Sequence, residues 1–174
     1  RGHIGHLQRR EGLIALSDGG GQNARFPPAV VVERWVERDH IRLKLLGEPS
    51  RISPELRRLI AKTDEISAHY DGFQANVCIN HGGRDEIVRA AKKFAALCME
   101  GAMQPEELTE GLFSSYLDSA GIPDPELIIR TSGEERLSGF LLWQCAYSEF
   151  YFTDVLWPDF GTDELDKAIA VYNS

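Results

Sequence analysis

The sequence predicts an α/β fold in which a single domain holds a central, mainly parallel sheet flanked by helices. Three β-rich segments, at residues 41–46, 73–80 and 127–129, are separated by segments with helical periodicity, an order typical of βαβ units. The 174 residues suffice for one domain with a sizeable core. Hydrophobic residues make up 43% and charged residues 26%, which are ordinary values for a globular protein.

The first strand, residues 41–46, is followed by a helix with a clear start. Ser53 is a natural N-cap, and Pro54 suits the first helical position because its missing N–H is not needed there. Apolar residues then recur at helical spacing, which predicts a buried face. This face consists of Leu56, Leu59, Ile60 and Ile66.

The second strand, residues 73–80, is predicted from an alternating pattern. Ala75, Val77 and Ile79 alternate with the polar Gln74 and Asn76, so we expect one apolar and one polar face. The next predicted element is a helix.

A glycine pair, Gly82-Gly83, leads into this helix at residues 85–99. Its expected apolar stripe consists of Ile87, Val88, Ala91, Phe94, Ala95 and Leu97. Pro105 then starts a short helical piece, and Thr109 or Ser114 can cap the next one. After the strand at 127–129, the sequence predicts a helix or turn at 140–147, a short strand at 149–152 and a helix at 162–172.

Bulk properties exclude several classes of protein. The net charge of −8 argues against a nucleic-acid-binding protein, which would normally carry a basic face. No apolar stretch approaches the roughly 20 residues that span a bilayer, and nothing reads as a signal peptide. The three cysteines, Cys78, Cys98 and Cys145, are widely spaced among apolar residues and predict reduced thiols. We therefore expect a cytoplasmic protein.

The segment at residues 130–140 carries the most chemical information. A buried strand ends at Arg130, and Arg136 follows six residues later in a loop rich in serine and glycine. Two guanidiniums, hydroxyls such as that of Ser138 and exposed backbone N–H groups could cradle a diphosphate. The alternative is a solvated turn whose arginines pair with Glu134 and Glu135. In parallel sheets, ligands bind at the carboxyl ends of strands, where both this loop and the segment Asn80–Arg84 are expected.

Three segments resemble the cis-prenyltransferases, the undecaprenyl diphosphate synthase family. They are residues 124–160, which resemble the signature end of the family, the Asn80-His81-Gly82-Gly83-Arg84 segment and residues 41–53. The family has Asn-Tyr-Gly-Gly-Arg at the second of these, so His81 is a departure. The resemblance covers roughly residues 40–174 and implies the cis-prenyltransferase fold.

The resemblance implies a reaction and its site residues. An allylic diphosphate such as farnesyl diphosphate would condense with isopentenyl diphosphate, with Mg²⁺ as cofactor, to give a polyprenyl diphosphate. The expected product is undecaprenyl diphosphate, the carrier lipid of cell-wall synthesis, and this lipid would bring peripheral contact with a membrane. Arg130, Arg136 and Ser138 match the residues that hold isopentenyl diphosphate. Glu149 matches a glutamate of the Mg²⁺ site, which in the family often lies near the partner subunit.

Two further candidates for substrate binding are Asn80 and Arg84. Arg84 could instead have a purely structural role, in a salt bridge with Asp85 or Glu86. Glu149, if buried, would need a cationic partner. Family members are homodimers, and the aromatic segment at residues 147–157 could supply such an interface.

The first forty residues are short or divergent relative to the family. On one alignment Asp18 takes the place of the catalytic aspartate and would be the main Mg²⁺ ligand, whereas Gln22 and Asn23 replace the family's arginine and tryptophan. Alternatively the glycines at 19–21 form a flexible loop, or Gly2-His3 aligns with a later pair and removes Asp18 from the site. Two other functions stay open: a short- or medium-chain prenyltransferase, and a catalytically silent partner subunit.

Overall fold

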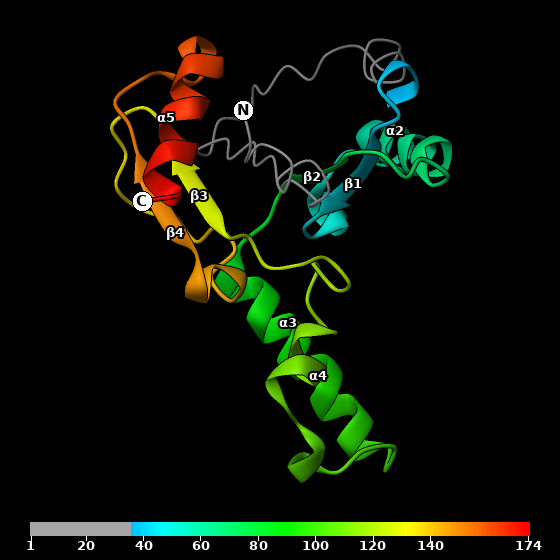
Figure 1. The fold of residues 1–174 in the computed structure, drawn as a ribbon. Helices are drawn as coiled ribbons and strands as arrows, with labels where there is room; N and C mark the ends of the chain where they lie inside the picture. Colours follow the sequence, from blue (N-terminus) through cyan, green and yellow to red (C-terminus); the bar gives the residue numbers. More distant parts are fainter. Residues whose placement is uncertain (1–35) are drawn as a thin grey trace. The chain divides into compact units, whose positions relative to one another are not determined.

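A computed structural model describes residues 36–174, and the chain divides into two compact units (Figure 1). The first unit ends at Pro123 and the second comprises Asp124–Ser174. The first holds β1 (Arg42–Leu46), α2 (Pro54–Ser67), β2 (Gln74–Cys78), α3 (Gly83–Met99) and α4 (Glu110–Ser114). The second holds β3 (Leu127–Arg130), β4 (Glu149–Phe152) and α5 (Thr162–Tyr172). The other elements are 3₁₀ helices at Pro49–Arg51, Pro105–Glu107, Gln144–Tyr147 and Trp157–Asp159.

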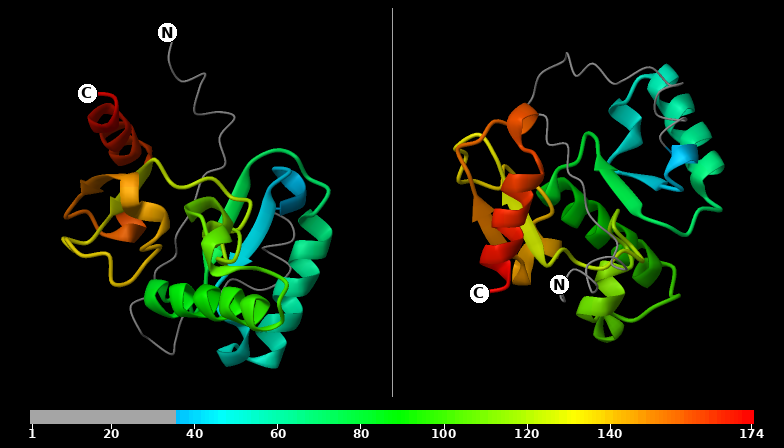
Figure 2. Two further views of the ribbon diagram at one scale, coloured as in Figure 1. Left: turned by 90° about the horizontal axis from the view of Figure 1, so that it is seen from below. Right: turned by 45° about the horizontal axis from the view of Figure 1, so that its top comes forward.

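In the first unit β1 and β2 pair in parallel, from Arg42 beside Gln74 to Leu46 beside Cys78. Helix α2 lies along β1 in both views of Figure 2. The predicted start of α2 is confirmed, because Ser53 Oγ accepts a hydrogen bond from the Leu56 N–H at 3.3 Å.

The predicted buried face of α2 is partly wrong. The fully buried residues are Thr63 and Ser67, whereas the four predicted apolar residues are only half-buried. Ser67 Oγ accepts from the Leu43 N–H at 3.1 Å and donates to the Leu43 carbonyl at 3.2 Å. Small hydroxyl side chains therefore let the helix approach the strand closely and bond to its backbone.

The polar face predicted for β2 is not exposed. Gln74 and Asn76 are both buried, and Gln74 Nε2 donates to Asn76 Oδ1 at 2.8 Å. The strand is therefore covered on both faces, as is usual for a parallel sheet. Alternation of side-chain polarity indicated the strand correctly but not its exposure.

The buried stripe of helix α3 shares only Phe94 with the predicted one. Its buried residues are Gly83, Glu86, Ala90 and Phe94, whereas the predicted Val88, Ala91 and Ala95 are exposed. The predicted stripe held apolar residues only and so omitted Glu86, whose buried carboxylate lies 2.9 Å from His81 Nε2 and accepts the Asp118 N–H. Downstream, Thr109 is confirmed as the N-cap of α4, since its Oγ1 accepts from the Leu112 N–H at 3.1 Å.

In the second unit β3 and β4 pair in parallel, and α5 packs beside β4 (Figure 1). The predicted helix or turn at 140–147 is a 3₁₀ helix over Gln144–Tyr147. Tyr172 near the end of α5 donates its hydroxyl to Glu126 Oε2 at 3.1 Å, just ahead of β3. The core of this unit includes Ile128, Leu141, Cys145 and Ala168.

All three cysteines are free thiols, as predicted. Burial is the main factor that raises the pKa of Cys78 to about 12, with the charges of Glu86 and Asp118 adding to it. Burial also raises the pKa of Cys145. Among residues 36–174, none of the helices has the length and apolar character that crossing a bilayer requires.

Candidate functional site

The two segments predicted to bind substrate each follow the carboxyl end of a strand. Asn80–Arg84 come after β2 in the first unit, and residues 131–139 come after β3 in the second. This is the end of a parallel strand where ligands are usually bound. The third predicted element of the site, Asp18, lies outside the residues that the structure describes.

The arginine loop begins as an extension of the strand pair. Thr153 N–H donates to the Arg130 carbonyl at 3.0 Å, Gly133 N–H donates to the Thr153 carbonyl at 3.0 Å, and Ser132 N–H donates to the Val155 carbonyl at 2.9 Å. These two loop amides are therefore occupied, which corrects the expectation that the loop's N–H groups are open to a phosphate.

Glycine suits the turn of this loop. Gly133 has a φ of 67°, in the left-handed region, and a Cβ there would lie 3.1 Å from Asp154 Oδ1. Ser132 next to it also has a positive φ, of 69°. The chain thus turns tightly between the two arginines.

The two arginines of the loop differ in exposure. Arg130 is half-buried at the last residue of β3, whereas the Arg136 side chain is 70% exposed and lies 2.6 Å from Glu134 Oε2. The alternative in which an arginine pairs with a glutamate thus holds for Arg136. Arg136 is the exposed partner of a half-buried Glu134, and ion pairs near the surface contribute only about 0–1 kcal/mol, so a multiply charged diphosphate can displace Glu134. Ser138 is exposed in the same loop, with a φ of 50°.

Glu149 lies away from this loop within the second unit. It is the first residue of β4 and pairs with Leu127, whereas Arg130 pairs with Phe152. At about 3.3 Å per residue, three residues separate the two positions by roughly 10 Å along the strands. Glu149 is exposed and has no ion pair among the described residues, so the expected cationic partner is not needed.

Asn80 joins the ends of β1 and β2. Its Nδ2 donates to the Glu48 carbonyl at 2.8 Å, and its own carbonyl accepts from the Glu48 N–H at 3.4 Å. The backbone of Asn80 is left-handed, with a φ of 51°. A Cβ at Gly47 would lie 2.1 Å from the Ile79 carbonyl oxygen, so the backbone segments that follow β1 and β2 are in direct contact here. The amide of Asn80 is thus engaged in fixing the turn.

Arg84 is exposed at the start of α3, and among the described residues it forms no salt bridge with Asp85 or Glu86. Asp85 instead accepts from Arg89 Nε at 2.9 Å, and Glu86 lies 2.9 Å from His81 Nε2. The guanidinium of Arg84 therefore stays a candidate for a phosphate at this helix start, where negative charge is favoured.

A buried polar network that the sequence did not reveal underlies this turn. The side chains of His81 and Glu86 are only 2% and 1% exposed. Glu86 Oε2 lies 2.9 Å from His81 Nε2, and Glu86 Oε1 accepts the Asp118 N–H at 2.8 Å. Arg89 then holds both oxygens of Asp118, at 2.8 and 2.7 Å.

This network has a clear electrostatic pattern. The hydrogen bonds that Arg89 donates to Asp118 are the main cause that holds the pKa of Asp118 below its ordinary value, and the same bonds are the main cause that raises the pKa of Arg89. The spacing of Asp85 and Arg89 is a helical i,i+4 pair that sequence could have suggested. The pairing of Arg89 with Asp118, 29 residues apart, gives no sequence signal.

His81, Glu86 and Asp118 could in principle hold a metal ion, because their ligand atoms lie within 4.8 Å of one another. Their oxygens, however, already accept from Arg89, His81 and a backbone N–H. Mg²⁺ prefers oxygen ligands with several waters, which a site enclosed to this degree does not supply. We interpret the three residues as a structural network.

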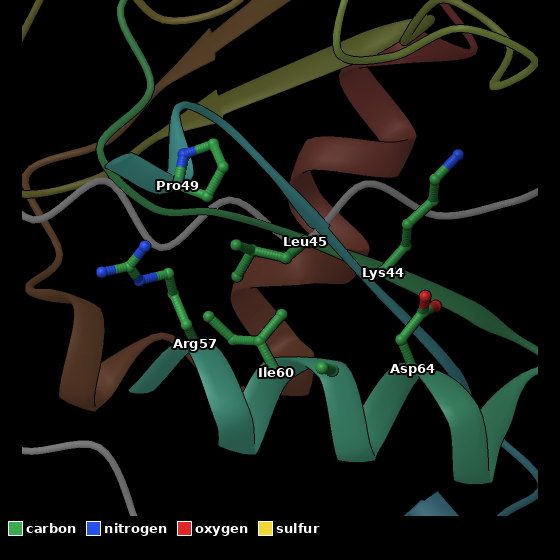
Figure 3. A pocket seen from close by; sticks show the side chains of 7 residues that line it. Lys44, Leu45, Pro49, Arg57, Ile60 and Asp64 are labelled. Atoms are coloured by element: carbon green, nitrogen blue, oxygen red, sulfur yellow. The ribbon is translucent and has the colours of Figure 1, made fainter. Parts of the chain in front are cut away.

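A cavity of about 350 Å³ lies between β1 and α2 (Figure 3). Leu45 and Ile60 face each other in its middle, with Arg57 at one end and Lys44 and Asp64 at the other. None of the predicted site residues that the structure describes lines it, and we assign it no part in the site.

Known proteins show clear sequence similarity to this chain. The family described as "Putative undecaprenyl diphosphate synthase" matches residues 28–174. The chain is 47% identical over 139 residues to an isoprenyl transferase of Prochlorococcus marinus subsp. pastoris, covering 80% of this chain and 51% of that protein. An isoprenyl transferase of Bacillus subtilis is 46% identical over 134 residues, covering 77% of this chain and 52% of that protein.

Solved structures confirm the predicted α/β fold. The lavandulyl diphosphate synthase of Lavandula x intermedia, solved in complex with dimethylallyl diphosphate, is 37% identical with a TM-score of 0.78. That match covers 81% of this chain and 61% of the other. A "probable undecaprenyl diphosphate synthase" of Campylobacter jejuni is 31% identical with a TM-score of 0.71, covering 84% of this chain and 66% of the other. The chain spans about half the length of the curated relatives it matches.

Proposed function

Because this chain belongs to the undecaprenyl diphosphate synthase family of cis-prenyltransferases, we propose that the protein condenses isopentenyl diphosphate with an allylic diphosphate. In this reaction a carbon–carbon bond forms, the allylic diphosphate group leaves, and a proton is lost so that the new double bond is cis. The enzyme must therefore hold two diphosphates and stabilise the charge that develops on the one that leaves.

The arginine loop is the observation that carries this proposal. Arg130 is the last residue of β3 and Arg136 lies in the loop that follows, where the largely exposed Arg136 side chain pairs with Glu134. We assign Arg130, Arg136 and Ser138 to the diphosphate of isopentenyl diphosphate. Arg84 is a second contact at the start of α3. Asn80, also in the first unit, is a further proposed substrate-binding residue, and its bond to the Glu48 carbonyl supports an indirect contribution through the turn.

Mg²⁺ is the proposed cofactor, and when bound it would neutralise the leaving diphosphate. The proposed ligands are Asp18 and Glu149. The exposed carboxylate of Glu149 suits this ion, which needs only one or two carboxylates beside phosphate oxygens and water. The strand register puts Glu149 at the opposite end of β4 from the arginine loop, which supports a role in a neighbouring subunit's site.

A homodimer is the proposed assembly. Phe150 and Phe152 on β4 are exposed and stack on each other with their centroids 5.9 Å apart, and Tyr147 is 93% exposed. Exposed aromatic side chains of this kind are enriched at protein interfaces, so this strand is the proposed contact. We propose a cytoplasmic enzyme whose lipid product brings it to the membrane surface.

The proposed allylic substrate is farnesyl diphosphate and the proposed product undecaprenyl diphosphate for the cell-wall carrier lipid. A short-chain product is the second candidate, because the chain is also similar to a lavandulyl diphosphate synthase. The chain length of the radiolabelled product from farnesyl or dimethylallyl diphosphate separates the two. A full-length protein that gives no Mg²⁺-dependent product from either would instead be a silent partner subunit.

The diphosphate cradle is tested by removing each guanidinium. We expect Arg130→Ala and Arg136→Ala to weaken binding of isopentenyl diphosphate by about 1.5–3 kcal/mol, the scale of charge-assisted hydrogen bonds. Arg136→Lys keeps the charge but loses the bidentate fork, so it should recover only part of this loss. Lys92→Ala, an exposed cation of α3, is the matched control. Wild-type affinity in both arginine variants would refute the cradle.

A further inference from the structure

We propose that His81 is a positioning residue whose bond to Glu86 sets the turn that carries Asn80 and Arg84. The inference rests on the proposed function, because it assigns this turn to diphosphate binding. His81 is 2% exposed and so acts through the turn and not by touching substrate.

The turn needs support because its backbone is unusual. Asn80 has a φ of 51°, a left-handed conformation that is uncommon for residues with a Cβ and that asparagine adopts more readily than most. β2 ends at Cys78 and α3 begins at Gly83, so the four residues 79–82 must make the whole turn. On one side the Asn80 amide is held by the Glu48 carbonyl at 2.8 Å. On the other side the holding contact is that of His81 with Glu86.

Glu86 can serve as this anchor because it is itself fixed. It lies in the first turns of α3 with its side chain 1% exposed, and its second oxygen accepts the Asp118 N–H at 2.8 Å. Asp118 is in turn held by both terminal nitrogens of Arg89, which comes from the next turn of α3. Buried hydrogen bonds of this kind are strong and directional, so the His81 ring has one favoured orientation.

The consequence for binding is geometric. His81 follows Asn80 directly and precedes Arg84 by three residues, so loss of its bond to Glu86 would free the backbone of this turn to shift. Displacement of a binding group by about 1 Å is enough to lose much of a directional contact to a phosphate. The network should therefore affect substrate affinity more than the chemical step.

The test compares variants of His81 whose side chains can or cannot donate a hydrogen bond to Glu86. Phenylalanine keeps an aromatic ring but cannot donate to Glu86, whereas tyrosine, the residue common in the family, and glutamine can. In the full-length protein we expect His81→Phe to raise the KM for isopentenyl diphosphate about tenfold with kcat changed less than twofold. His81→Tyr or His81→Gln should recover the KM to within about twofold of wild type. An unchanged KM in His81→Phe, or equal loss in all three variants, would overturn the inference.

Hydrogen exchange of the amides at residues 79–86 separates this inference from the proposed function. If wild type makes no prenyl product, the proposed function fails and the exchange rates decide the positioning role alone. Faster exchange in His81→Phe than in His81→Tyr or His81→Gln supports it, and equal rates in all variants overturn it. Lys92→Ala again serves as the control, since it lies on α3 outside the network.

Discussion

Replacing Glu86 with alanine should destabilise the first unit by an amount that its contacts define. Two buried partners, His81 Nε2 at 2.9 Å and the Asp118 N–H at 2.8 Å, would lose their acceptor. Each buried polar group left without a partner costs about 1–3 kcal/mol, so Glu86→Ala should lower the free energy of unfolding by about 2–6 kcal/mol. The cavity left by the side chain would add to this cost.

Two variants bracket this value. Glu86→Gln keeps one oxygen and can still satisfy one of the two donors, so it should cost about 1–3 kcal/mol. Lys92→Ala removes an exposed side chain of the same helix and should stay within about 0.5 kcal/mol of wild type.

The measurement is urea unfolding followed by circular dichroism, together with hydrogen exchange of the α3 amides, which reports the first unit alone. A midpoint for Glu86→Ala equal to that of Lys92→Ala would refute the network as a source of stability.

Two more predictions concern the same unit. Arg89 lowers the pKa of Asp118 below its ordinary value of 3.8 in the folded state. The pair therefore stabilises the fold at pH values above 3.8. This stabilisation is lost as the pH falls through the pKa that Asp118 has in the folded protein. Asp118→Asn should therefore lower the melting temperature at pH 7 and flatten its fall below pH 4, and a wild-type slope would contradict this. Gly47→Ala should cost about 3 kcal/mol or more, because its φ is 128° and its Cβ would lie 2.1 Å from the Ile79 carbonyl oxygen. Gly101→Ala, at a φ of 72° with open space around it, should cost only about 1–2 kcal/mol in urea unfolding, and equal losses would show that the close approach is unimportant.

Sequence reasoning succeeded where local chemistry decides the structure. Ser53 and Thr109 cap their helices as predicted, because an N-cap needs only a side-chain oxygen and the next few N–H groups. The strand that ends at Arg130 was also predictable, since an apolar run stops there at polar and glycine residues. The position of the arginine loop at the carboxyl end of a parallel strand followed from the same pattern.

Sequence reasoning failed where partners distant in the chain decide the structure. From the sequence alone, a charged residue such as Glu86 is expected to face solvent. It is buried because its carboxylate oxygens find hydrogen-bond partners in His81 and the Asp118 N–H. Likewise, Ser67 is buried because it bonds to Leu43, 24 residues away. The roles of Asp18 and of Glu149 in metal binding still rest on the family resemblance and stay predictions.

A crystal structure of the full-length protein with isopentenyl diphosphate and Mg²⁺ tests the central claim most directly. We expect a diphosphate within about 2.7–3.2 Å of the guanidinium nitrogens of Arg130 and Arg136, with the contact between Arg136 and Glu134 opened. A diphosphate bound away from this loop, with Arg136 still on Glu134, would contradict the account.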